Sequence, residues 1–328
     1  MPGSVVPDRQ PVVCDLNRRQ FLGAATCGVG ALSSGRAFTA EPAGKPELTF
    51  ALATDTHFGR QVGDEERLQQ LVDEINRSDA QFTLFCGDLV HNGQADGKDK
   101  QYLVWKDTTK ALKKDYFAVP GNHDPDPVFL KHIARQTDFV FEHKDFRFVC
   151  FRNAEPNPGH DGIVTPEQLK WLQARLEEAR KKDQRVVLAA HVIFHENKHP
   201  DVGWYIKKGR EEFGKLLQAN KHVVTFLAGH FHCGLRGWDD TSGIHEVVLP
   251  SASWNTDRGL AKAPGYSLEE FRASWVLAEL FADRLVLHYR PFGVQPAAIK
   301  ELAIKKQRSA KELKFRRFPI TPLQLGKQ

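Results

Sequence analysis

Short apolar runs alternate along this chain with longer stretches whose apolar positions recur at helical spacing. The runs are rich in β-branched or aromatic residues, as buried strands are, and they cover residues 48–53, 82–86, 116–119, 186–190 and 223–228. The stretches between them cover residues 64–78, 100–113, 166–182 and 208–219. Strands that alternate with helices predict an α/β protein in which helices pack on the faces of a sheet.

The last third of the predicted domain has a different pattern. Residues 274–280 and 284–289 are two strand-like runs around Ala282-Asp283, which predicts an antiparallel hairpin. Residues 246–249 form one more short strand-like run. Earlier in the chain, prolines and glycines in residues 153–165 predict a long surface loop.

A polar cluster directly follows each of the five strand-like runs in the first part of the chain. In chain order the clusters are Asp55-Thr56-His57, Gly87-Asp88, Gly121-Asn122-His123-Asp124, His191 and Gly229-His230-Phe231-His232. Ligands of open α/β sheets bind beyond the carboxyl ends of the strands. We therefore expect all five clusters to meet at one edge of the sheet.

The residue types in these clusters are those of a transition-metal site. Carboxylate and amide oxygens combined with imidazole nitrogens suit Mn, Fe, Zn or Ni, and no cysteine is offered for a structural zinc site. Two such ions about 3.5–4 Å apart can activate water and hold both the attacking and the leaving oxygen of a phosphate ester. Any one cluster could be an ordinary turn or a core histidine; their joint presence in this order predicts a dinuclear centre.

This set of motifs resembles the calcineurin-like metallophosphoesterase superfamily, from about residue 48 to residue 290. The resemblance implies a four-layer α/β/β/α sandwich of two mixed sheets flanked by helices. It implies hydrolysis of a phosphomonoester or phosphodiester through a hydroxide that bridges two divalent or trivalent metal ions. Two alternatives stay open: a cyclic-nucleotide or nucleotide phosphodiesterase of the same superfamily, and a non-catalytic protein that binds a phosphate ligand on the same fold.

The resemblance also implies a role for each residue of the motifs. The first metal would be held by Asp55, His57 and His232, the second by Asn122, His191 and His230, and both by the bridging Asp88. His123 would not bind metal; it would stabilise the substrate phosphate and protonate the leaving oxygen. Asp124 would orient the His123 ring, since a carboxylate fixes the imidazole tautomer and raises its pKa.

One position departs from a related pattern. Purple acid phosphatases carry a tyrosine three residues after the bridging aspartate, and this chain has His91 there. A tyrosinate-bound ferric ion is therefore not expected. We expect His91 to cap a loop rather than to face the site.

Five further residues could contact a phosphorylated small molecule or nucleotide. They lie in polar loops or at a strand end, and each could equally serve local packing: His195, Trp204, Tyr205, Trp254 and Asn255.

The first forty residues are of a different kind. Arg18-Arg19-Gln20-Phe21-Leu22 precedes a mildly apolar run that is rich in glycine and alanine. This resembles a twin-arginine (Tat) export signal, and the run is too short to span a membrane. We expect a bacterial protein that the Tat machinery exports to the periplasm or the exterior.

The sequence divides into four predicted segments. We expect a signal peptide over residues 1–40, a linker over 41–47, one catalytic domain over 48–295 and a basic tail over 296–328. The formal net charge of +5 comes from mixed charges, so no nucleic-acid-binding module is indicated. Beyond the leader we expect no transmembrane span. Cys86, Cys150 and Cys233 are expected to be buried apolar residues.

Overall fold

The structure, a computed structural model, describes residues 44–93, 97, 99–196, 203–239, 245–255, 272–282, 284–292 and 323–324. The twin arginine, most of the basic tail and the first residues of the linker lie outside the described residues. Those parts of the predicted domain organisation remain predictions.

The first sheet has six strands in the order β14-β13-β12-β1-β2-β3. Their bounds are β1 Leu48–Ala53, β2 Thr83–Cys86, β3 Tyr116–Val119, β12 Ser274–Leu280, β13 Arg284–Pro291 and β14 Leu323–Gln324. β1, β2 and β3 run parallel, whereas β12 pairs antiparallel with β1 and with β13. The predicted C-terminal hairpin is thus confirmed, and it makes this sheet a mixed one.

The second sheet has six strands in the order β10-β11-β9-β7-β5-β4. Their bounds are β4 Phe139–His143, β5 Phe146–Cys150, β7 Arg185–Ala189, β9 Val223–Ala228, β10 Arg236–Asp239 and β11 His245–Val248. The central strands β5, β7, β9 and β11 are parallel, and the edges β4 and β10 are antiparallel. A further small sheet joins β6 (Gly162–Ile163) to β8 (Ile206–Lys208).

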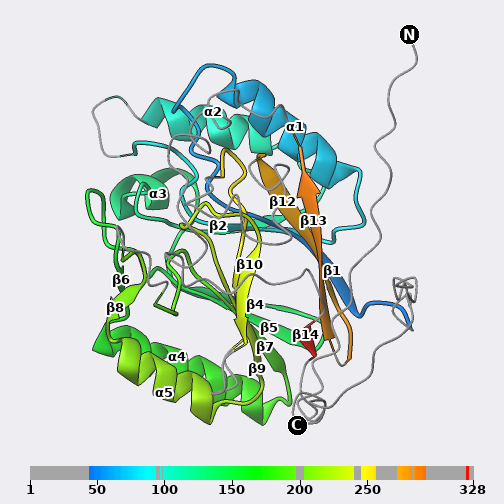
Figure 1. The fold of residues 1–328 in the computed structure, drawn as a ribbon, viewed down its shortest axis with the longest axis vertical. Helices are drawn as coiled ribbons and strands as arrows, with labels where there is room; N and C mark the ends of the chain where they lie inside the picture. Colours follow the sequence, from blue (N-terminus) through cyan, green and yellow to red (C-terminus); the bar gives the residue numbers. More distant parts are fainter. Residues whose placement is uncertain are drawn as a thin grey trace, which may run out of the picture.

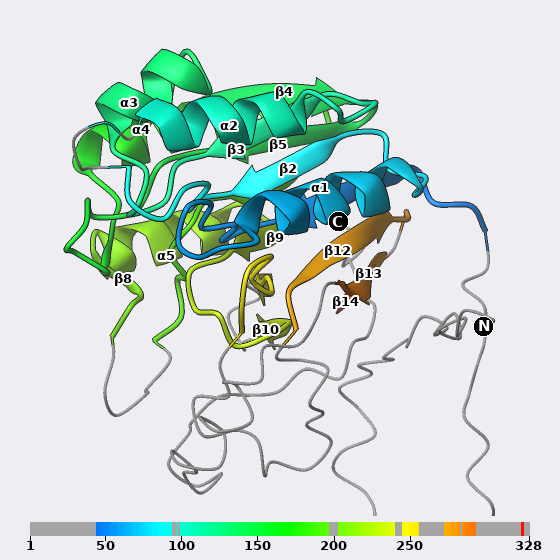
Figure 2. The same cartoon turned by 90° about the horizontal axis from the view of Figure 1, so that it is seen from above.

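Helices cover the outer faces of the two sheets (Figure 1). The first sheet carries α1 (Asp64–Asn76), α2 (Asp99–Thr109) and α3 (Asp126–His132), and the second carries α4 (Pro166–Lys181) and α5 (Arg210–Ala219). The view from above shows α1 and α2 alongside β2, with the C-terminal strands β12 and β13 beside them (Figure 2). This arrangement confirms the predicted four-layer α/β/β/α sandwich.

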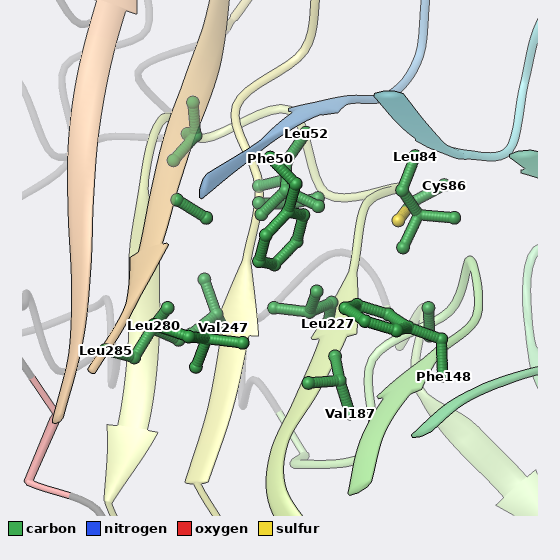
Figure 3. Close-up of a cluster of buried hydrophobic side chains, with 14 of the residues drawn as sticks. Phe50, Leu52, Leu84, Cys86, Phe148, Val187, Leu227, Val247, Leu280 and Leu285 are labelled. Atoms are coloured by element: carbon green, nitrogen blue, oxygen red, sulfur yellow. The ribbon is translucent and has the colours of Figure 1, made fainter. Parts of the chain in front are cut away.

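The hydrophobic core between the two sheets explains why they stack. Alternate side chains of both inner faces meet there, among them Phe50 of β1, Leu84 of β2, Phe148 of β5 and Val187 of β7 (Figure 3). All four are fully buried. Burial of such side chains is worth about 1.5–3 kcal/mol each, so the core holds the two sheets, and the loops at their ends, in a fixed relation.

Most predicted elements agree with the structure to within a few residues. α4 starts where expected because Thr165 and Gln168 form a capping box at its N-terminus. Cys86, Cys150 and Cys233 are buried, as predicted. Among the described residues, no helix has both the length and the apolar character that a membrane crossing requires.

Candidate metal centre

The polar clusters lie where strands end, and the backbone turns sharply there. Asp55, His57, Asp88, His230 and His232 all have positive φ values, between 41° and 69°. This left-handed region is uncommon for residues other than glycine and costs energy, and such strain tends to gather at functional sites. The turns bring side chains from separate strands into one group at the edge of the sandwich.

The glycines of three motifs are required by close packing. A β-carbon on Gly87 would lie closer than 3.0 Å to the His191 ring, and one on Gly121 would collide with Asp88. A β-carbon on Gly229 would collide with Asp55. The glycine before each of these ligand positions therefore leaves room for a ligand that comes from another strand.

Two groups of potential metal ligands result. In the first, His232 Nε2 lies 3.0 Å and His57 Nε2 lies 3.7 Å from Asp55 Oδ1. The second consists of Asp88, His191 and His230. Within each group the ligand atoms all lie within 4.8 Å of one another, and every residue is buried.

Asp88 belongs to the second group and also approaches the first. Its Oδ2 atom is 3.5 Å from His57 Nε2 of the first group and 3.3 Å from His191 Nε2 of the second. Its Oδ1 atom accepts a hydrogen bond from the backbone N–H of His123, at 2.9 Å. One carboxylate oxygen is thus directed at both groups while the other is anchored to the backbone, the geometry that a bridging ligand needs.

The second ring nitrogen of three histidines is anchored to a backbone carbonyl. His191 Nδ1 lies 2.8 Å from the carbonyl oxygen of Cys86, and His232 Nδ1 lies 2.8 Å from that of Trp254. His230 uses Nε2 for the carbonyl oxygen of His160, at 2.9 Å. Metal-binding histidines are commonly held in this way, because the outer hydrogen bond fixes both the tautomer and the ring orientation. The nitrogens that a metal would take are then Nε2 of His191, Nε2 of His232 and Nδ1 of His230.

The unpaired atoms and the electrostatics fit a bound cation. Among the described residues, His191 Nε2 and Asn122 Oδ1 are buried without a hydrogen bond. Burial alone would lower the pKa of His191, but the carboxylates of Asp88 and Asp55 raise it to about 9. Burial, followed by the charge on His191, lowers the pKa of His230 to about 3. The carboxylates thus hold a positive charge in the cluster, where metal binding would displace the proton.

The prediction that Asp124 orients the His123 ring is wrong. Both Asp124 oxygens are occupied elsewhere: Oδ2 accepts from the backbone N–H groups of Leu89 and Gly121, each at 3.0 Å, and Oδ1 accepts from Tyr102 Oη at 2.7 Å. The Asp124 carboxylate therefore ties two loops and α2 together beneath the site. Among the described residues, the group that orients the His123 ring is the backbone carbonyl of His91, which accepts from Nδ1.

His91 faces the site, contrary to our expectation. Its Nδ1 atom lies 3.2 Å from His57 Nδ1, and its ring stacks on that of His123 with centroids 5.2 Å apart. His57, His91 and His123 form a third group of close ring nitrogens. In this group His91 connects a proposed metal ligand to the proposed general acid.

Two of the predicted substrate contacts border the site. The Trp254 ring lies 4.4 Å from that of His232 and 4.6 Å from that of His57. The Trp204 ring lies 5.3 Å from that of His230. An indole thus stands beside each of the two ligand groups.

The other three candidates have different surroundings. Asn255 is fully buried, and its amide bonds the backbone of Ser251, Gly234 and Arg272, so the substrate contact predicted for it is wrong. His195 Nδ1 lies 2.7 Å from Glu246 Oε2 in a buried pair. The Tyr205 ring lies beneath the guanidinium of Arg210, at 5.6 Å. Substrate contact by His195 and Tyr205 remains a prediction.

Two residues at the site were not found from the sequence. His160 lies in the predicted surface loop, and its ring lies 5.1 Å from that of Trp204, while its carbonyl holds His230. The Arg60 guanidinium stacks over Trp254, 3.4 Å from the ring centroid. Neither belongs to a ligand motif; the proline and glycine content around His160 indicated only a loop.

Comparison with known proteins agrees with this geometry. The calcineurin-like phosphoesterase family matches residues 48–234, more than half of the chain, and the protein belongs to that family. Its fold is similar to that of a dimetal phosphatase from Danio rerio, with a TM-score of 0.61 over 75% of this chain and 97% of that one, at 19% identity. The family has a dinuclear metal site, to which the two ligand groups correspond.

Two curated relatives are similar over part of their length. A probable glycerophosphodiester phosphodiesterase of Arcobacter nitrofigilis is 28% identical over 46% of this chain and 56% of its own. A manganese-dependent ADP-ribose/CDP-alcohol diphosphatase of Xenopus laevis is 35% identical over 40% of this chain and 35% of its own. The chain thus spans between a third and three fifths of these two relatives.

Proposed function

We propose that the protein is a metal-dependent phosphoesterase that uses two transition-metal ions. The observation that carries this proposal is the position of Asp88 Oδ2, 3.5 Å from His57 Nε2 and 3.3 Å from His191 Nε2, between two buried ligand groups. The proposed ligands are Asp55, His57 and His232 for one ion, Asn122, His191 and His230 for the other, and Asp88 for both. When bound, the ions would supply an activated water and neutralise phosphate charge.

The protein's own groups would handle the leaving oxygen. The Nδ1–H group of His123 donates a hydrogen bond to the carbonyl of His91. The other ring nitrogen, Nε2, is then the one that would give a proton to the leaving oxygen. The ring lies 4.8 Å from that of His57, so this nitrogen is held close to the ligand groups. A histidine held in this way can protonate the alkoxide that leaves phosphorus.

The bond we favour is a phosphodiester or diphosphate bond. The two curated relatives named above are a phosphodiesterase and a diphosphatase. A cyclic-nucleotide substrate is the alternative within the same chemistry. The rival proposal, a non-catalytic protein that binds a phosphate ligand, fits less well because six of the seven proposed ligands form two close groups and the His123 ring lies beside that of His57.

Turnover of simple aryl esters tests the proposal. The manganese-loaded chain should hydrolyse bis(4-nitrophenyl) phosphate, 4-nitrophenyl phosphate or both, and a chelator should abolish turnover. The Asp88→Asn variant is the matched control for contaminating phosphatases. Absence of turnover on both esters and on a broad panel of phosphate esters would contradict an enzymatic role.

We further propose that the protein is exported by the Tat pathway. Support comes from Arg18-Arg19 followed by Phe21-Leu22, and from the value of loading metal in the cytoplasm before a folded protein is exported. The double substitution Arg18→Lys with Arg19→Lys keeps the charge but removes the forked guanidinium geometry. It should leave the protein unprocessed but active in the cytoplasm; export in a Tat-deficient strain would refute the proposal.

A further inference from the structure

An arginine stands at the edge of the metal centre. The Arg60 guanidinium stacks over the Trp254 ring at 3.4 Å, and the same ring lies 4.6 Å from His57 and 4.4 Å from His232. The Trp254 backbone carbonyl also accepts from His232. Trp254 thus connects Arg60 to the first ligand group through its ring and through its backbone.

The guanidinium of Arg60 has no carboxylate partner among the described residues. Asp64, four residues further along the chain, has other partners: Oδ2 accepts from the backbone N–H groups of Arg60 and Gln61, and Oδ1 pairs with Arg67 Nη2 at 2.6 Å. Arg60 itself is exposed. Its positive charge is therefore available to a ligand in solution.

The stacking geometry also leaves the donors of Arg60 available. Stacking uses the flat face of a guanidinium, whereas its N–H groups point outward in the plane and suit a phosphate. The Arg60 guanidinium, with its N–H donors available, is thus held on the Trp254 ring beside the first ligand group.

We propose that Arg60, supported by Trp254, binds a second phosphate adjacent to the scissile one, so that the enzyme prefers diphosphate diesters over single-phosphate diesters. This inference rests on the proposed function and names its substrate class. In the reaction, water adds its oxygen to one phosphorus and the bridging P–O bond breaks. The bridging oxygen stays on the second phosphate, the group that Arg60 contacts, and two monoesters are released.

A matched pair of substrates tests the inference: bis(4-nitrophenyl) phosphate, and the diphosphate that carries one 4-nitrophenyl group on each phosphorus. The measurement is kcat/KM for both, followed by product separation, with wild type, Arg60→Gln and Arg60→Lys. Hydrogen bonds to charged groups contribute about 1.5–3 kcal/mol. We therefore expect Arg60→Gln to lower kcat/KM for the diphosphate about 10–100-fold more than for the diester, with Arg60→Lys in between.

Two controls separate binding from a general effect. Arg77→Gln removes an exposed arginine at the end of α1, paired with Glu74, and should leave the ratio of the two kcat/KM values unchanged. Binding of the methylene-bridged diphosphonate analogue, measured by calorimetry, should weaken in Arg60→Gln by a similar factor. This readout does not depend on turnover.

The outcomes are distinct. Equal losses on both substrates in Arg60→Gln, or no loss, would overturn the role of Arg60. Wild-type turnover of the diester without turnover of the diphosphate would overturn the substrate class while the proposed function stood. Failure of the wild type on both substrates and on other phosphate esters would overturn the proposed function, and this inference with it.

Discussion

The Nδ1 atoms of His57 and His91 lie 3.2 Å apart, and this contact sets His57 apart from the other proposed histidine ligands. His191, His230 and His232 each use a backbone carbonyl as the outer partner, whereas His57 uses a side chain. Burial, then the charges on His123 and Arg60, lower the pKa of His91 to about 4, so its ring is neutral at pH 7 and its Nδ1 can accept a hydrogen bond from His57 Nδ1.

We therefore predict that His91→Phe weakens metal binding at the first ligand group. Loss of an outer hydrogen-bond partner typically costs about 10–100-fold in metal affinity, and phenylalanine keeps the stacking on His123 while it removes the acceptor. Competitive titration with a metal indicator measures the change. His91→Asn should restore part of the affinity, and His288→Phe, which alters a remote histidine paired with Glu279, should change nothing. Unchanged affinity in His91→Phe would show that this contact does not support the metal.

Gly121→Ala should disrupt the site without unfolding the protein. The added methyl group would collide with both the carboxylate and the backbone N–H of Asp88. We expect metal to be lost and turnover to fall by at least about 10-fold, the lower end of the effect of a lost outer contact. Gly63→Ala is the matched control, because its methyl group would meet nothing closer than 4.0 Å although the residue has a φ of +89°. It should reduce thermal stability slightly and keep metal content normal. Equal metal content in the two variants would contradict the role given to Gly121.

Asp88→Asn and His232→Ala should differ in how many ions they affect. Asp88 Oδ2 lies near both groups, so its loss should weaken both metal sites at once, whereas His232 belongs to the group around Asp55. Metal content after dialysis at graded free metal concentrations measures each site. An Asp88→Asn protein that keeps both ions and near-normal activity would show that Asp88 does not bridge.

His123→Ala should keep its metal and lose rate. Loss of a general acid lowers the rate by about 10²–10⁴-fold, and the loss should shrink for aryl esters whose leaving group needs no proton. The measurement is kcat for a series of diesters of increasing leaving-group pKa. A constant loss across the series would mean that His123 binds phosphate rather than transfers a proton.

The positions of the proposed ligands at the sheet edge were predictable because each lies just after a strand, where local sequence already places it. The contacts between loops were not. Asp124 follows His123 in sequence, yet its carboxylate accepts hydrogen bonds from the Tyr102 hydroxyl of α2 and from the backbone N–H of Leu89. Tertiary packing brings these donors to it, and the local sequence does not show that. His160 acts through its backbone carbonyl, which no side-chain pattern reveals.

The short helix α3 and the contact between Arg60 and Trp254 were also not predicted from the sequence. α3 spans seven residues, Asp126–His132, too few for a helical period to be recognised. Arg60 and Trp254 are far apart in the chain, and only the folding of both sheets brings them together. The sequence therefore predicts which side chains gather at this edge of the sheet better than it predicts the contacts around them.

Metal stoichiometry tests the central claim most directly. The purified chain, equilibrated with manganese and freed of excess, should hold about two ions per molecule in elemental analysis, as a two-metal hydrolase requires. The Asp88→Asn variant, treated in the same way, should hold markedly less. Wild-type protein that retains no metal under these conditions, and that hydrolyses phosphate esters equally well with a chelator present, would contradict the account.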